Sequence, residues 1–318
     1  MEKKSHPNKK TGKSVDNIKA FFSKSQVKYS LLAVFILIMS FLVQYFVNKP
    51  NLGTFLGSDM DSSGNVYVLG VDKDKDQYKI TKISKSGSTE FKINLEKTTS
   101  EYDYSYSNVE ADSKGNFYVV KRQRDLSAVV SDKSLYPIKS EVVMMYDTSG
   151  NYIKQVASFD FSKDATPPTY AYIKKLQLVN QSMTIIRCKD NIYDIITANP
   201  LADESPKKVK SFEIKPPTVI ADQNLEWVSD ISVLSGGRVF YATKSGDFMA
   251  MDNSGDFVDY SSAVSNSQFL ITGMSVDSND NVYFTDSLSG NFYKLDTGSI
   301  VSKSIYNLES SLISNADV

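Results

Sequence analysis

An eight-residue motif that recurs along the chain constrains the fold more than any other feature of the sequence. It occurs as Asp61-Ser-Ser-Gly-Asn-Val-Tyr-Val68, as Asp112-Ser-Lys-Gly-Asn-Phe-Tyr-Val119 and as Asp277-Ser-Asn-Asp-Asn-Val-Tyr-Phe284. Asp, Ser, Gly and Asn favour a tight turn, and the aromatic and β-branched residues after them favour a strand. Degenerate copies begin at Leu234 and at Val179. We therefore expect five related units, each opening with a β-hairpin.

The spacing of the motif predicts the architecture. Asp61 and Asp112 are 51 residues apart, and the 165 residues from Asp112 to Asp277 fit three repeats of 55. A second hairpin follows each first one, so that a unit holds about four strands. The repeat is slightly longer than the ~40–50 residues of a common propeller blade. The predicted fold class is all-β, a β-propeller of about five four-stranded blades over residues 52–318.

The fifth unit resembles a known family. The run Gly273-Met-Ser-Val-Asp-Ser-Asn-Asp-Asn-Val-Tyr-Phe-Thr-Asp-Ser-Leu-Ser-Gly-Asn-Phe-Tyr-Lys-Leu-Asp296 is similar to an NHL-type propeller repeat, and Val109–Val119 is similar more weakly. The resemblance covers roughly residues 52–318 and implies a fold rather than a function. Residues 170–215 depart from the pattern, and residues 121–141, with Arg122 and Arg124, are interpreted as an inserted loop.

The last residues of the sequence repeat the start of a unit. Ser314-Asn-Ala-Asp-Val318 parallels Ser107-Asn-Val-Glu-Ala-Asp112, which precedes a motif turn. Because propeller rings close on themselves, we predict a fragment of a longer protein, presumed bacterial, with six or more blades. A complete five-bladed ring with a frayed tail is the alternative.

A single apolar stretch predicts a membrane anchor at residues 27–48. Leu31–Val47 carries no charge, and at ~1.5 Å per residue the predicted helix matches a ~30 Å hydrocarbon core. A buried core helix would be amphipathic, and a cleaved signal peptide would end in an A-x-A-like site, which is missing here. Eight lysines precede the stretch. The positive-inside rule therefore places the lysine-rich tail, residues 1–26, in the cytoplasm and residues 52–318 outside it.

Composition excludes several chemistries. Residues 1–50 hold nine lysines and two acidic residues, which leaves 27 basic and 35 acidic residues for the rest of the chain. An acidic domain argues against nucleic acid as a partner. The only histidine, His6, lies in the tail, so a Ser-His-Asp triad or a His-bound zinc in the domain is excluded. The lone Cys188 cannot form an internal disulfide and is interpreted as a buried strand residue rather than a reactive thiol.

Two acidic segments partly match calcium loops. Asp72-Lys-Asp-Lys-Asp76 lacks the glycine and glutamate that an EF-hand loop needs at positions 6 and 12. Asp59-Met-Asp-Ser-Ser-Gly64 also lacks the final glutamate, because Gly70 occupies that position. Turns without metal are favoured at both places. No cofactor is predicted, and calcium is the alternative.

Tyrosines supply the candidate ligand contacts. Tyr102, Tyr104 and Tyr106 alternate in one segment, and Tyr170 and Tyr172 alternate in another. In propellers such blade-opening segments lead to the central channel or to a rim, and tyrosine can stack on sugars or anchor a protein. The alternative is that these tyrosines only lie at the edge of the core.

Two functional hypotheses remain. The first is a membrane-anchored extracytoplasmic binding, sensing or scaffold module for a protein, peptide or glycan, with no catalytic residues assigned. The second is a carboxylate-metal hydrolase similar to gluconolactonase-type propellers, which needs acidic residues of several blades to converge on a metal. The propeller could also be the sensor half of a longer protein, which is compatible with the first hypothesis.

Overall fold

The computed structural model describes residues 54–307 apart from short connecting segments. The residues outside the description are 1–53, 73–74, 128–137, 162–170, 180, 190, 216–226, 235, 252–253, 260–270, 278, 287–290, 297–300 and 308–318. The predicted tail, membrane helix and C-terminal repeat start therefore lie outside the described residues. Among the residues that are described, none forms a helix long and apolar enough to cross a membrane.

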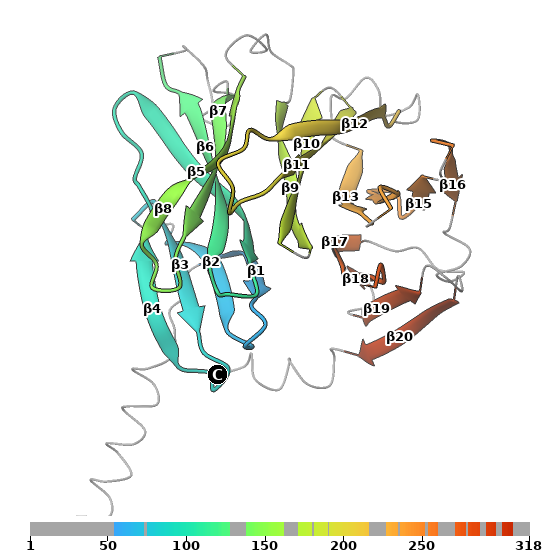
Figure 1. Ribbon diagram of the computed structural model, residues 1–318, viewed down its shortest axis with the longest axis horizontal. Coiled ribbons are helices and arrows are strands. Elements are labelled where there is room, and N and C mark those ends of the chain that lie inside the picture. Colours follow the sequence, from blue (N-terminus) through green and yellow to red (C-terminus); the bar gives the residue numbers. More distant parts are fainter. Residues whose placement is uncertain are drawn as a thin grey trace, which may run out of the picture. The chain divides into compact units, whose positions relative to one another are not determined.

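The described strands form five antiparallel sheets, each with four strands in sequence order. Blades 1 and 2 contain β1 (Thr54–Met60), β2 (Val66–Asp72), β3 (Gln77–Ile83), β4 (Thr89–Asn94), β5 (Tyr102–Ala111), β6 (Phe117–Asp125), β7 (Ile138–Tyr146) and β8 (Tyr152–Asp160). Blades 3, 4 and 5 contain β9 (Ala171–Val179), β10 (Ser182–Lys189), β11 (Ile192–Ala198), β12 (Lys207–Glu213), β13 (Val228–Val233), β14 (Val239–Thr243), β15 (Phe248–Met251), β16 (Phe257–Asp259), β17 (Ile271–Val276), β18 (Val282–Asp286), β19 (Asn291–Asp296) and β20 (Val301–Asn307). The predicted five-bladed, all-β propeller is confirmed (Figure 1). The described part of the divergent segment, β9 to β12, forms a regular third blade.

The first strand of each blade is its inner strand. β1, β5, β9, β13 and β17 contact one another in succession. Each inner strand also contains a β-bulge, because its register with the second strand of the blade shifts once. A bulge increases the local twist of a strand. Its recurrence in all five blades shows that it belongs to the repeat.

An apolar cluster fills each of the four successive blade interfaces. Strand β6 illustrates the origin of these clusters, because neighbouring residues of a strand point to opposite faces. Phe117 and Val119 pack in the cluster shared with blade 1, whereas Tyr118 and Val120 pack in the cluster shared with blade 3. All four side chains are fully buried. At about 1.5–3 kcal/mol for each large side chain, this packing accounts for the continuous apolar run in the motif.

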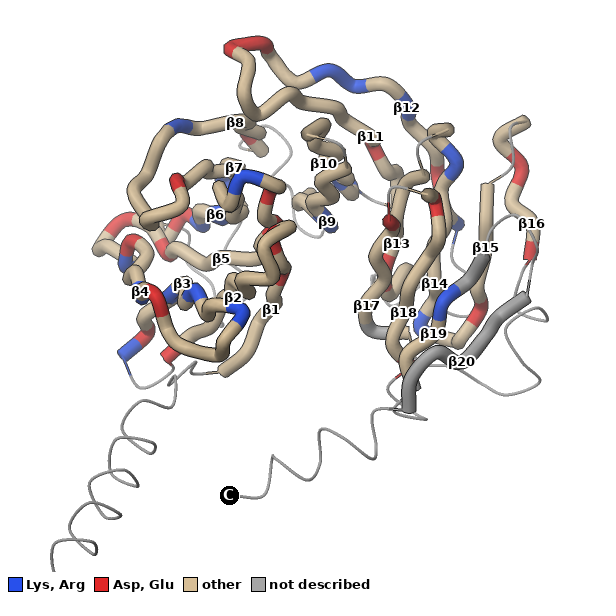
Figure 2. Tube along the Cα trace, turned by 60° about the horizontal axis from the view of Figure 1, so that its bottom comes forward, with Lys and Arg blue, Asp and Glu red and all other residues tan. Residues whose placement is uncertain are grey.

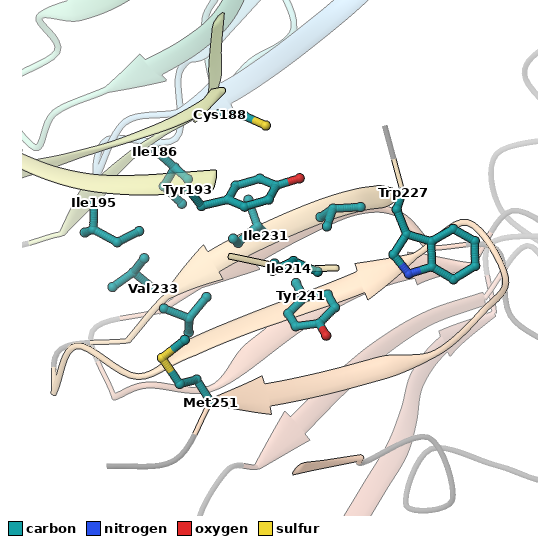
Figure 3. Close-up of a cluster of buried hydrophobic side chains, with 12 residues drawn as sticks. Ile186, Cys188, Tyr193, Ile195, Ile214, Trp227, Ile231, Val233, Tyr241 and Met251 are labelled. Atoms are coloured by element: carbon teal, nitrogen blue, oxygen red, sulfur yellow. The ribbon is translucent and has the colours of Figure 1, made fainter. Parts of the chain in front are cut away.

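The cluster between blades 3 and 4 contains the only cysteine. Cys188 and Tyr193 of blade 3 face Ile231, Tyr241 and Met251 of blade 4 (Figure 3). Cys188 lies in β10 and is buried. The predicted placement as a buried strand residue is confirmed.

The motif turn is held by one aspartate. Asp61 Oδ1 accepts the backbone N–H groups of Ser63 and Asn65, at 2.9 and 3.0 Å, and Oδ2 accepts Asn65 Nδ2 at 2.9 Å. The Tyr67 hydroxyl, which donates to the Gly115 carbonyl at 2.7 Å, also lies 3.3 Å from Asp61 Oδ2. Burial alone would raise the pKa of Asp61, but these hydrogen bonds hold it below its ordinary value.

The same backbone and amide hydrogen bonds recur at the turns headed by Asp112, Asp147 and Asp277. Asp147 heads a second hairpin, between β7 and β8, so the turn is used at two places within a blade. The residue before the asparagine has positive φ in every copy. It is glycine in three copies and Asp280, with φ of 63°, in the fifth blade.

Candidate binding surface on blade 2

The strands of blade 2 are longer than those of blade 1. They span 10, 9, 9 and 9 residues, compared with 7, 7, 7 and 6 in blade 1. The turns of Asp112 and Asp147 lie at one end of the sheet, so the start of β5, the end of β6 and the start of β7 meet at the other. The extra length carries polar and aromatic residues at the edge of the apolar cluster between blades 1 and 2, against which Tyr104 packs.

Two tyrosines and two lysines form what we call the tyrosine shelf at this end. The rings of Tyr102 and Tyr104 stack with centroids 6.5 Å apart and planes 21° apart. Lys121 Nζ lies 3.8 Å from the centre of the Tyr104 ring, and Lys139 Nζ lies 4.6 Å from that of Tyr102. Lys139 also donates a hydrogen bond of 2.8 Å to the Tyr102 hydroxyl. Cation–π contacts of this kind contribute about 0.5–1 kcal/mol each at exposed sites.

Electrostatics keep the shelf in one protonation state at neutral pH. Burial, followed by the nearby charge of Glu96, raises the pKa of Tyr104, so its hydroxyl stays neutral. The hydrogen bond to Tyr102 raises the pKa of Lys139, so this lysine stays charged. Lys121 forms an ion pair with Glu96, which balances its charge. The shelf therefore presents half-buried phenol rings beside two charged lysines.

A pocket of about 200 Å³ adjoins the shelf on the same face of the sheet. Cross-strand pairing places Gln123 opposite both Tyr104 and Ser140, and opposite residues share a face. We call this cavity the blade 2 pocket, and its lining comprises Lys121, Gln123, Ser140, Val142, Met144, Tyr152 and Gln155. Sequence reasoning missed the pocket, because its polar residues come from three strands and form no local motif.

The five predicted tyrosines do not form one site. Tyr106 is on the same face as Tyr102 and Tyr104 but is buried, and its hydroxyl donates to the Glu96 carbonyl at 3.2 Å. Tyr172 belongs to blade 3 and packs against the cluster between blades 3 and 4. Tyr170 lies outside the described residues. The structure thus brings together Tyr102 and Tyr104 from the predicted set.

The interpretation of residues 121–141 as a loop is wrong at both ends. Arg122 and Arg124 lie in β6, because the β5–β6 ladder continues to Asp125. Arg122 Nε donates to Glu141 Oε1 at 2.6 Å, and the same carboxylate accepts the backbone N–H of Ile173 in blade 3. Glu141 is fully buried, which raises its pKa against the opposing effect of Arg122. Glu141 therefore joins blades 2 and 3, and Arg122 pairs with it rather than lying free on a loop.

Hydrogen bonds between inner strands are a further feature that the sequence analysis missed. Side chains of one blade accept the backbone N–H of the next. The pairs are Asp59 with Ala111 at 2.7 Å, Glu110 with Leu178 at 3.3 Å, Gln177 with Val233 at 3.0 Å and Asp230 with Met274 at 2.6 Å. Lys175 adds an ion pair with Asp230, at 2.8 Å. The sequence contains a pattern that could have indicated these hydrogen bonds, because Asp59 and Glu110 each precede a motif aspartate by two residues.

The two acidic segments that resemble calcium loops lie at turns. Asp72 ends β2 and forms an ion pair of 3.3 Å with Lys75. Asp59 and Asp61 accept the protein hydrogen bonds described above. Among the described residues, no three His, Cys, Asp or Glu side chains are grouped so that they could hold a metal ion.

Comparison with known proteins gives similarity of fold only. No protein-family model and no curated protein matches the chain. A protein of unknown function from Bacteroides caccae is 10% identical over 80% of this chain and 81% of that chain, with a TM-score of 0.47. A structure of YCF48 bound to D1 peptide is 9% identical over 82% and 69%, with a TM-score of 0.44. A structure of the nidogen/laminin complex is 10% identical over 80% and 80%, with a TM-score of 0.46.

Proposed function

We propose that this chain is a membrane-anchored binding module whose five-bladed propeller presents the tyrosine shelf to a protein, peptide or glycan outside the cytoplasm. The observation that carries the proposal is the stacked pair Tyr102–Tyr104 with a lysine on each ring. Tyrosine and nearby cations are enriched at contact sites because they supply rigid apolar area together with polar groups.

The charge distribution supports recognition of a defined ligand rather than of nucleic acid. Along the described blades, Lys and Arg alternate with Asp and Glu instead of gathering in one basic surface (Figure 2). A nucleic-acid site requires clustered positive charge. The proposed role is non-enzymatic, and the hydrogen bonds already accepted by Asp59, Glu110 and Asp230 support it.

Binding is tested with the full-length protein immobilised in detergent micelles and exposed to cell-envelope extract. We expect the wild type to retain a partner or glycan that the double variant Tyr102→Ala/Tyr104→Ala loses. Phe55→Ala is the matched control, because Phe55 is an exposed aromatic residue of blade 1. Equal retention by the wild type and the double variant would contradict the role of the shelf.

The anchor and its orientation need a separate experiment. Residues 27–48 are proposed to cross the membrane, with residues 1–26 in the cytoplasm. Alkaline phosphatase fused to the C-terminus should be active, because it folds only outside the cytoplasm, and a green fluorescent protein fusion should be dark. The reverse pattern would overturn the proposed localisation without affecting the binding surface.

A further inference from the structure

We infer that the blade 2 pocket binds one neutral sugar ring of a glycan, with the tyrosine shelf contacting the rest of the ligand. This inference rests on the proposed binding function and names its ligand class. The pocket lies on the face of the sheet that carries Tyr104, next to Gln123. A ligand that enters the pocket therefore extends directly over the shelf.

The pocket combines an apolar floor with unused polar groups. Val142 and Met144 of β7 are half-buried and form part of the lining. Ser140 Oγ donates to Gln123 Oε1 at 3.3 Å, and this bond orients the Gln123 amide. Within the described residues, Gln123 Nε2 and the whole amide of Gln155 have no hydrogen-bond partner. One amide nitrogen and one complete amide are thus available to a ligand.

A sugar ring matches this set of groups. A pyranose has an apolar face of C–H groups and a rim of hydroxyls that both donate and accept hydrogen bonds. Tyr152 is 54% exposed at the edge of the pocket, where its ring can stack on such a face. The amides of Gln123 and Gln155 can donate to and accept from the rim.

The volume and the charge of the blade 2 pocket restrict the class of ligand further. The volume of about 200 Å³ is below the roughly 300–1,000 Å³ of typical small-molecule sites, so one ring fits and a larger rigid molecule does not. Among the described residues of the lining, Lys121 is the only charged one, and Glu96 already pairs with it. The pocket therefore favours a neutral sugar over an acidic one.

The position of the pocket argues against an extended peptide as the ligand. Peptides that add a strand need the free edge of a sheet. This pocket is lined by residues of β6, β7 and the edge strand β8, and it lies across the face of the sheet that these three strands share.

The test uses the full-length protein in lauryldimethylamine oxide micelles, because a sugar-headed detergent would compete. An array of neutral oligosaccharides, including chitotriose, maltotriose and cellotriose, is screened, and hits are measured by calorimetry. We expect at least one oligosaccharide to bind. Gln155→Leu and Gln123→Leu should each weaken binding about tenfold or more, because each leaves ligand hydroxyls unpaired. Lys154→Ala, which changes the opposite face of β8, should leave the affinity unchanged.

Three outcomes would overturn the inference. One is the absence of binding by every neutral oligosaccharide, and another is binding that both glutamine variants retain. The third is a protein or peptide ligand that Gln155→Leu releases. Denaturation midpoints of the variants show whether they are folded. If the glycans fail but envelope extract still yields a ligand that Tyr102→Ala/Tyr104→Ala loses, the proposed binding function stands and only the ligand class falls.

Discussion

The two ends of blade 2 are built on different principles. At the turn end, Asp112 and Asp147 repeat one set of hydrogen bonds that is also present in blades 1 and 5. At the other end, the tyrosine shelf is built on Tyr102 and Tyr104 of the inner strand β5, and no other described inner strand contains two tyrosines. Repetition therefore marks the scaffold, and departure from the repeat marks the candidate binding surface.

Burial adds a second difference between these ends. Asp112 and Tyr118 at the turn end are buried, whereas Tyr102 and Tyr104 are half-buried and Tyr152 is exposed. Substitutions at the turn end should therefore change stability, and substitutions at the shelf should change binding. The following predictions test this contrast, from the largest expected effect on the free energy of unfolding to the smallest.

The largest effect is expected for Asp112→Ala. This change removes the carboxylate that accepts hydrogen bonds from Lys114 N, Asn116 N and Asn116 Nδ2. It also removes the partner of the buried Tyr118 hydroxyl, which in the wild type donates to Asp112 Oδ2 at 3.1 Å. We expect a loss of about 2–4 kcal/mol in urea denaturation, since unpaired buried groups cost about 1–3 kcal/mol each.

The matched control for Asp112→Ala is Asp147→Ala. Asp147 heads the same turn in an exposed position, where water can replace its hydrogen bonds. A smaller loss than for Asp112→Ala is expected. Equal losses for the two variants would mean that burial does not decide the cost of breaking the turn.

A second test concerns the glycine of the turn. Gly115 has φ of 84°, and an added Cβ would lie 3.2 Å from Thr148 Cγ2 and from the Tyr67 hydroxyl. Gly87 has φ of 86° but no atom within 4 Å of that position. Both alanine variants carry the backbone strain of about 1–2 kcal/mol, and Gly115→Ala adds crowding.

We therefore expect Gly115→Ala to lower the unfolding free energy by about 1 kcal/mol more than Gly87→Ala does. Thermal denaturation of both variants under one set of conditions measures the difference. A larger loss in Gly87→Ala would show that contacts across the blade interface do not constrain the turn.

These turns also show how much of the fold the sequence could predict. The blade count and the hairpins followed from the spacing of Asp61, Asp112 and Asp277, because the turn chemistry is local and its residues are contiguous. Even the divergent third blade kept its apolar alternation. Local patterns were therefore sufficient wherever neighbours in sequence make the hydrogen bonds.

Long-range contacts could not be predicted in the same way. Arg122 was placed on a loop because its partner Glu141 lies 19 residues away and Ile173 lies in another blade. The tyrosines alternated as a strand, but nothing local indicated that Tyr172 would lie in a different interface from Tyr104. The pocket depends on the register of three strands, which a single sequence specifies only weakly.

The third prediction tests the inner strands near the turn end by pH. Burial, and then the charge of Asp59, raises the pKa of Glu110 well above 4.5, while Lys175 opposes the rise. The folded state thus disfavours the carboxylate. The ionisation of Glu110 therefore lowers the free energy of unfolding as pH rises from the ordinary pKa of the unfolded state through the raised pKa of the folded state. Below the ordinary pKa, Glu110 is protonated in both states and has no such effect.

Glu110→Gln should therefore be more stable than the wild type at pH 7, and the difference should disappear below pH of about 4.5. Melting curves from pH 3.5 to 8 measure this. Asp61→Asn is the contrasting variant and should be less stable at pH 7, because the hydrogen bonds to its carboxylate hold the pKa of Asp61 below its ordinary value. A destabilised Glu110→Gln at pH 7 would mean that the contact with Leu178 requires a charged acceptor.

The smallest effect on stability is expected when one hydroxyl is removed from each region. Tyr67 donates to the Gly115 carbonyl at 2.7 Å and is fully buried, so Tyr67→Phe should cost about 0.5–1.5 kcal/mol. Tyr102 is half-buried and accepts a hydrogen bond from Lys139, which water can satisfy after Tyr102→Phe. We expect a change within about 0.5 kcal/mol for this variant. Retention of the envelope ligand should nevertheless fall, because Lys139 loses the contact that holds it over the ring. If Tyr102→Phe cost as much stability as Tyr67→Phe and left retention intact, the shelf would belong to the scaffold, and the longer strands of blade 2 would need another explanation.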